Sequence, residues 1–78
     1  MIKMVKKDVG KDKISYYYQP NGEGEPGVVS YYPRENREVV EKPCAGVNYS
    51  VDRYHAFMAL ETFVQNGEYP DEYQVNWY

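Results

Sequence analysis

Glycine and proline divide this chain into short segments, and a single segment is long enough for a helix with an apolar face. Residues 20–27 contain three glycines and two prolines, which disrupt any regular strand or helix. Gly10 and Pro33 interrupt the chain on either side of this stretch, and Gly67 and Pro70 interrupt it again near the C-terminus. The segments in the first half of the chain are short enough to be strands, so they predict a β-rich fold.

Five segments have the residue types and the alternation that are typical of strands. They are 2–9, 14–19, 28–32, 37–42 and 73–78. The segment 14–19 has the clearest alternation, because Ile14, Tyr16 and Tyr18 point to one side and the residues between them to the other. Pro33 suits the second position of a turn, so the strands before and after it are predicted to form an antiparallel hairpin.

Residues 51–66 are predicted to form the helix. Ser50 is a suitable N-cap, Gly67 suits the left-handed position after the last turn, and Pro70 prevents continuation. Five apolar residues fall within an arc of about 120° on a helical wheel, as a helix packed on a sheet requires. They are Ala56, Phe57, Leu60, Phe63 and Val64. Four polar residues lie opposite and are expected to face water: Asp52, His55, Thr62 and Asn66.

This order of segments predicts an α+β fold, with an antiparallel sheet of three to five strands and one helix packed on one face. The expected order is β-β-β-α-β, with residues 2–9 as an additional candidate strand at the N-terminus. The 78 residues fit a single domain, spanning 1–78, with one modest core. The closing strand is expected to bring Val75 and Trp77 against the apolar side of the helix.

The small core is expected to need an additional source of stability. A core of this size contributes no more than about 3–5 kcal/mol of net stability, and small proteins usually add disulfides, a metal or a partner chain. Cys44 is the single cysteine, so an internal disulfide is excluded. His55 is the single histidine, so a zinc site of cysteines and histidines is not expected either. A partner chain remains, and the sequence therefore predicts a homo-oligomer.

The helix carries more apolar surface than one contact with a sheet requires. Val51, Tyr54 and Met58 form a second apolar strip beside the main arc, about 120° or more from Leu60 on the wheel. Residues so far around the helix cannot share the contact of Leu60 with the sheet. The strip is therefore predicted to be a protein interface.

Ten tyrosines favour an exposed aromatic surface, because a tyrosine ring packs on a sheet while its hydroxyl bonds to water or a partner. Tyr17 and Tyr31 are expected to share a sheet face, as interface residues or as a stacking platform for single-stranded nucleic acid. Such a platform also needs cations, and residues 14–78 carry four arginines and lysines against ten carboxylates. The charge balance disfavours nucleic acid and favours a protein partner, with a single-stranded nucleic-acid binder as the main alternative.

Few residues are candidates for catalysis. Cys44 precedes the helix and His55 lies in its second turn, so a small Cys/His enzyme is a further alternative. Two pairs of acidic residues lie in a loop or just before a strand, where acids usually serve solubility rather than hydrolysis. They are Glu23/Glu25 and Asp71/Glu72. The sequence predicts no catalytic residue, no metal and no cofactor, and the chain is expected not to be an enzyme.

The end of the chain resembles the endings of small uncharacterised bacterial proteins. The shared pattern is Asn66-Gly67-x-Tyr69-Pro70, followed by Val75-x-Trp77-Tyr78. The resemblance implies a helix followed by a closing strand, and it brings no functional residue with it.

The lysine-rich N-terminus is not followed by an apolar segment long enough for a signal peptide or a membrane-spanning helix. A cytoplasmic protein without a membrane partner is therefore expected. Taken together, these features predict a small non-catalytic protein-interaction module, of an accessory, immunity or inhibitor type.

Overall fold

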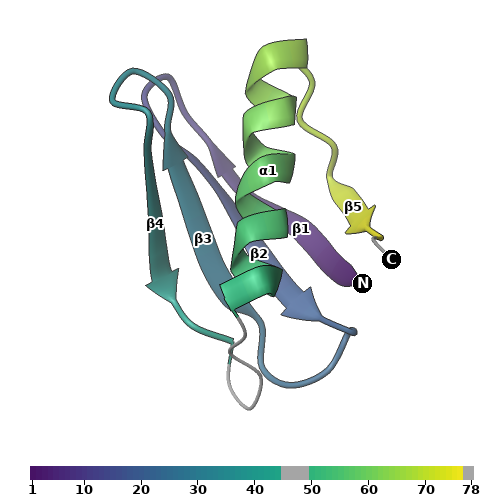
Figure 1. Cartoon of the computed structure of the whole chain (residues 1–78). Coiled ribbons are helices and arrows are strands. Elements are labelled where there is room, and N and C mark those ends of the chain that lie inside the picture. Colours follow the sequence, from purple (N-terminus) through teal and green to yellow (C-terminus); the bar gives the residue numbers. More distant parts are fainter. Residues whose placement is uncertain (45–49, 77–78) are drawn as a thin grey trace.

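The computed structural model describes residues 1–44 and 50–76, which form a five-stranded antiparallel sheet and one helix. The elements follow the order β-β-β-β-α-β, and the helix packs on one face of the sheet (Figure 1). They are β1 (Ile2–Val9), β2 (Ile14–Pro20), β3 (Gly27–Tyr32), β4 (Arg37–Lys42), α1 (Ser50–Asn66) and β5 (Glu72–Val75). The predicted α+β class is confirmed, and residues 2–9 are the additional strand.

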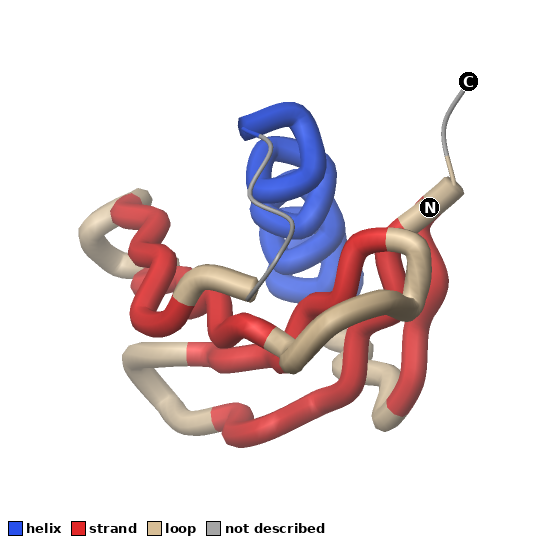
Figure 2. The backbone as a smooth tube through the Cα atoms, turned by 90° about the horizontal axis from the view of Figure 1, so that it is seen from below, coloured by secondary structure: helices blue, strands red, loops and turns tan. Residues whose placement is uncertain are grey.

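The strand order in the sheet is β4-β3-β2-β1-β5. The first four strands follow one another as antiparallel neighbours, including the predicted β3–β4 hairpin. The chain then leaves the β4 edge, passes through α1 and returns at the opposite edge, beside β1. Figure 2 shows the helix on one side of the curved sheet. The crossing is what places the helix over the sheet and β5 next to the N-terminal strand.

The bounds of the elements follow the breaks in the sequence to within one residue, except at the C-terminus. Pro20 and Gly27, predicted to lie in the loop, are the last residue of β2 and the first residue of β3. Gly67 has a φ of 69°, the left-handed conformation predicted after the last helical turn. The helix begins at Ser50, the predicted N-cap, but the side chain of this residue is not among those that the structure describes. Trp77, predicted to pack on the helix, also lies outside the described residues. The last strand is shorter than the predicted 73–78, because Val75 already pairs with Ile2 at the start of β1.

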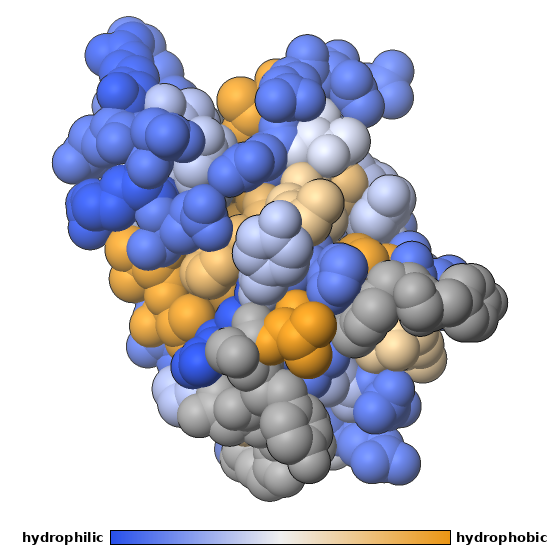
Figure 3. Space-filling model, in the orientation of Figure 1, coloured by the Kyte–Doolittle hydropathy of each residue, from blue (hydrophilic) through white to orange (hydrophobic). Residues whose placement is uncertain are grey.

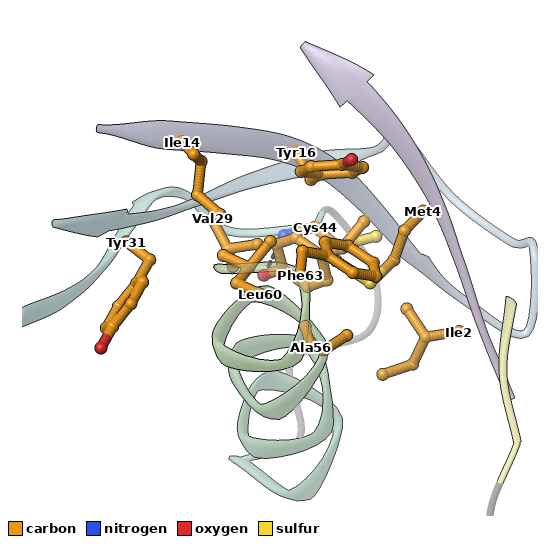
Figure 4. Close-up of a cluster of buried hydrophobic side chains, with 12 residues drawn as sticks. Ile2, Met4, Ile14, Tyr16, Val29, Tyr31, Cys44, Ala56, Leu60 and Phe63 are labelled. Atoms are coloured by element: carbon orange, nitrogen blue, oxygen red, sulfur yellow. Dashed lines mark hydrogen bonds between the residues drawn. The ribbon is translucent and has the colours of Figure 1, made fainter. Parts of the chain in front are cut away.

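The core lies between the sheet and α1. Tyr16 and Val29 point from the sheet towards Leu60 and Phe63 of the helix (Figure 4). The rings of Tyr16 and Phe63 pack with their centroids 5.1 Å apart. The buried cluster is completed by Ile2, Met4, Ile14, Tyr18, Tyr31, Cys44, Ala56 and Ala59. Tyrosine supplies much of the volume that aliphatic residues occupy in larger cores.

The helix is turned about its axis relative to the wheel prediction. Asp52, expected to face water, is buried, and so is Ala59. Both lie on the side of the helix that carries Phe63, whose ring packs on Tyr16 of the sheet and on Tyr73 of β5. Asp52 lies near Cys44, where its charge contributes to the raised pKa of the thiol. Phe57 and Val64, expected to face the sheet directly, are only half-buried at the rim of the core. The helical wheel is centred on the largest apolar residues, and the sequence alone does not show how the helix is rotated on the sheet.

Gly27 is required by the close approach of three segments. A Cβ atom at this position would lie 2.5 Å from the carbonyl oxygen of Lys42 and 2.6 Å from the backbone nitrogen of Cys44, and it would also strike the ring of Tyr18. Two of these neighbours are backbone atoms, which cannot move without displacing the end of β4.

We expect Gly27→Ala to lower the free energy of unfolding by about 1–3 kcal/mol, the usual range for inserting atoms into a packed site. Urea unfolding followed by circular dichroism measures the effect. Gly10→Ala is the matched control, since its nearest neighbour, the carbonyl oxygen of Lys13, would lie 3.4 Å from the new Cβ atom. Equal unfolding midpoints for the two variants would contradict the close packing at Gly27.

Candidate interaction surface

The outer side of α1 carries three large apolar side chains that the fold leaves exposed. Val51, Tyr54 and Met58 retain 48%, 61% and 44% of their accessible surface. They recur at intervals of three and four residues, so they form one continuous strip, which we call the helix strip. Figure 3 shows apolar residues at the surface along the course of the helix, with polar residues beside them. The strip predicted from the helical wheel is therefore accessible.

Polar groups border the helix strip. The hydroxyl of Thr62 donates a hydrogen bond to the carbonyl of Met58 at 3.0 Å, one turn further along the helix. The rings of Tyr54 and His55 meet edge to face, with centroids 5.7 Å apart. An apolar centre with a polar border is the usual composition of a protein interface.

Tyr17 and Tyr31 lie on opposite faces of the sheet, so the expectation of a shared face is wrong. Tyr31 pairs with Ile14, and Tyr17 lies three residues further along the same strand, on the other side. Tyr31 is only 7% exposed, and its hydroxyl donates a 2.8 Å hydrogen bond to Asn36 Oδ1. Tyr17 is exposed on the face away from the helix. The register of the β2–β3 pair places the two tyrosines on opposite faces. This register cannot be read from the sequence, because the loop between the two strands is too long to define it.

The open face of the sheet is covered largely by its own side chains. The guanidinium of Arg37 lies 4.2 Å from the ring centroid of Tyr32, and the ammonium of Lys13 lies 5.7 Å from it. Lys13 also forms an ion pair with Glu41, and this pair raises the pKa of Lys13 and lowers the pKa of Glu41. Both cations are engaged by carboxylates and by the ring of Tyr32.

Cys44 lies in the core. The residue is 2% exposed, and its backbone N–H donates to the hydroxyl of Tyr18 at 3.0 Å. Burial raises the pKa of the Cys44 thiol, and the charge of Asp52 acts in the same direction. A raised pKa disfavours the thiolate that nucleophilic catalysis needs. The ring of His55 meets the exposed ring of Tyr54 edge to face, whereas Cys44 belongs to the buried cluster.

One acid of each candidate pair, Glu23/Glu25 and Asp71/Glu72, lies beside a lysine of the sheet. Asp71 forms a 2.8 Å ion pair with Lys6, which lowers the pKa of Asp71 by hydrogen bonding and by charge. Glu25, in the exposed loop, lies 3.8 Å from Lys42. Within residues 1–44 and 50–76, no group of three or more histidines, cysteines or acids is placed to hold a metal ion.

One carboxylate pair was not foreseen. Glu38 on β4 and Glu61 on α1 face each other at the edge of the core. Partial burial raises the pKa of Glu38, and the hydrogen bond and the charge of Glu61 raise it further. The pair brings together a strand and a helix that are far apart in the chain, so no local pattern in the sequence could reveal it.

No protein-family model, no curated protein and no solved structure matches this chain significantly. No helix in the described part of the chain is long and apolar enough to cross a membrane.

We expect the native thiol of Cys44 to react with iodoacetamide about tenfold or more slowly than the same thiol in urea-unfolded protein, because the folded core excludes the reagent. Alkylation rates measured across pH by mass spectrometry test this expectation. Rapid modification of the folded protein, with an apparent pKa below that of an ordinary thiol, would contradict it.

The Glu38–Glu61 pair predicts a pH-dependent stability. The pKa of Glu38 is higher in the folded than in the unfolded chain, so its contribution to stability falls as pH rises through and above its ordinary value of 4.5. Glu61→Gln removes the like charge and is expected to raise the melting temperature at pH 7 but not at about pH 3, where both carboxyls are protonated. Glu23→Gln, in an exposed loop, is the control for net charge. A gain at pH 7 that is equal in both variants would exclude a specific pair.

Proposed function

We propose that this chain is a small non-catalytic protein-interaction module that binds through the helix strip, with a second copy of itself as the partner. The observation that carries the proposal is the exposure of Val51, Tyr54 and Met58 side by side on the outer face of α1. The three side chains do not contribute to the core, because other residues of the same helix fill it.

Physical considerations favour self-association. A domain of this size gains stability from any partner that binds only the folded state. A two-fold pairing of two identical helices is the commonest way to bury such a strip, because each copy supplies the same surface. A stable interface buries about 1,200–2,000 Å² in total, more than three side chains provide, so neighbouring polar residues of α1 must form its rim. We therefore expect a weak, concentration-dependent dimer.

The other predicted functions have less support. A stacking platform made of Tyr17 and Tyr31 is disfavoured by their opposite orientations, and the buried position of Tyr31 leaves no ring face for a base. A Cys/His enzyme is disfavoured by the burial and the raised pKa of Cys44. The small size, the net charge of -3 and the single cysteine are consistent with a cytoplasmic accessory, immunity or inhibitor-type protein of bacterial kind.

Met58→Glu is expected to abolish self-association, because it places a charge at the centre of the buried strip. In sedimentation velocity at about 100 µM the wild type should contain dimer and the variant should be monomeric. The melting temperature should rise with concentration only for the wild type. Val9→Glu, which changes another exposed apolar residue (42% exposed) outside the helix, should leave the dimer intact.

A wild-type chain that sediments as a monomer at this concentration would overturn the proposal. So would a Met58→Glu chain that has lost its circular dichroism spectrum, because Met58 would then belong to the core of the monomer.

A further inference from the structure

A hollow with aromatic walls lies between the C-terminal turn of α1 and β5. Its volume is about 420 Å³, and rings from the helix, the following loop and the last strand line it. We call it the aromatic pocket and define it by Phe63, Tyr69, Tyr73 and Glu68. Glu68 is the one charged residue among the described residues that line it.

Two rings that line the aromatic pocket pack on each other edge to face. The ring planes of Phe63 and Tyr73 make an angle of 87°, with centroids 4.9 Å apart. Phe63 is buried against Tyr16, so it forms a fixed inner wall. Tyr73 is 41% exposed and Tyr69 is half-buried, so both rings offer surface to a ligand that enters from solvent.

Hydrogen bonds hold the loop that carries these residues. The hydroxyl of Tyr16 donates to the carbonyl of Pro70 at 2.6 Å, and Lys6 Nζ donates to the carbonyl of Tyr69 at 3.1 Å. The N–H groups of Gly67 and Glu68 donate to the carbonyl of Phe63 at 2.9 and 3.3 Å, closing the end of the helix. The pocket is therefore formed before any ligand arrives, which lowers the entropic cost of binding.

The surroundings of the pocket are negatively charged. The helix ends here with the negative end of its dipole, and its last turn contains no basic residue to offset it. Glu68 lies at the rim, and Lys6, the cation that reaches this loop, is paired with Asp71. The aromatic pocket therefore disfavours anions, and the Glu68 carboxylate adds no charge attraction to the binding of a neutral ligand.

We propose that the aromatic pocket binds an organic ammonium group, either a quaternary or a methylated amine. The face of an electron-rich ring attracts a cation, and two tyrosines, Tyr69 and Tyr73, line the hollow. Alkyl groups on the nitrogen match the apolar walls, while Glu68 balances the charge. The site differs from the helix strip, so the proposal does not rest on the proposed function.

Choline and 3,3-dimethyl-1-butanol, which has nearly the same shape without the charge, provide the test. We expect choline to shift the NMR resonances of Tyr69 and Tyr73, and to bind about 3- to 30-fold more tightly than the neutral alcohol. Equal affinity for the two compounds, or shifts that exclude the pocket residues, would overturn the proposal.

Substitutions in the aromatic pocket test whether choline binds there. Tyr73→Leu keeps an apolar wall but removes the ring, so choline binding should weaken while binding of the alcohol changes little. Glu68→Gln should weaken choline binding in the same selective way. Tyr54→Leu, which removes an exposed tyrosine of the helix strip, should have no effect. Thermal melts verify that each variant is folded, and unchanged choline affinity in both folded pocket variants would exclude this site.

Two sources of the ammonium group can be distinguished. Free trimethyllysine is compared with a short neutral peptide that contains the same residue. Tighter binding of the peptide identifies a modified side chain of a protein, and equal binding identifies a free amine; both results support an ammonium site. Met58→Glu should retain choline binding, so failure of the dimer and failure of this site are separable outcomes.

Discussion

The packing of Tyr16 on Phe63 joins the three parts of this molecule. Tyr16 lies in the second strand of the sheet, Phe63 lies in the helix, and the Tyr16 hydroxyl reaches beyond the ring contact to the carbonyl of Pro70 before β5. Burial raises the pKa of Tyr16 to about 12, with a smaller contribution from the charge of Asp71, so the hydroxyl stays protonated as a donor. Without this contact, the helix would lose its central partner and the closing strand its support.

A single helix covers only one face of the sheet, so the opposite face must be protected by other means. The hydroxyls of Ser15 and Ser30 lie 2.7 Å apart and satisfy each other while almost fully buried. Arg37 covers the ring of Tyr32 with its guanidinium, as long charged side chains do on half-exposed apolar surfaces. Because side chains of the sheet cover much of this face, most of the large exposed apolar side chains lie on the helix strip and around β5.

The sequence predicted most of the element bounds because local signals determine them. Glycine and proline end the strands, and Gly67 ends the helix in the left-handed conformation that it favours. The errors concern relations between elements. The burial of Asp52 depends on how the helix is rotated on the sheet, and the face that Tyr31 occupies depends on a register set across a six-residue loop. The aromatic pocket also depends on Tyr16, which lies far from the pocket in the chain.

The helix strip and the aromatic pocket lie next to each other on α1, and Thr62 connects them. Thr62 lines the pocket, and its hydroxyl is bonded to the carbonyl of Met58 in the strip. One helical turn, about 5.4 Å, therefore separates the two surfaces. A second copy seated on the strip would lie close to the rim of the pocket, where it would either complete a wall or obstruct the entrance. Any coupling between the two surfaces would be reciprocal: dimerisation would change the free energy of binding in the pocket by the same amount as a ligand in the pocket changes the free energy of dimerisation.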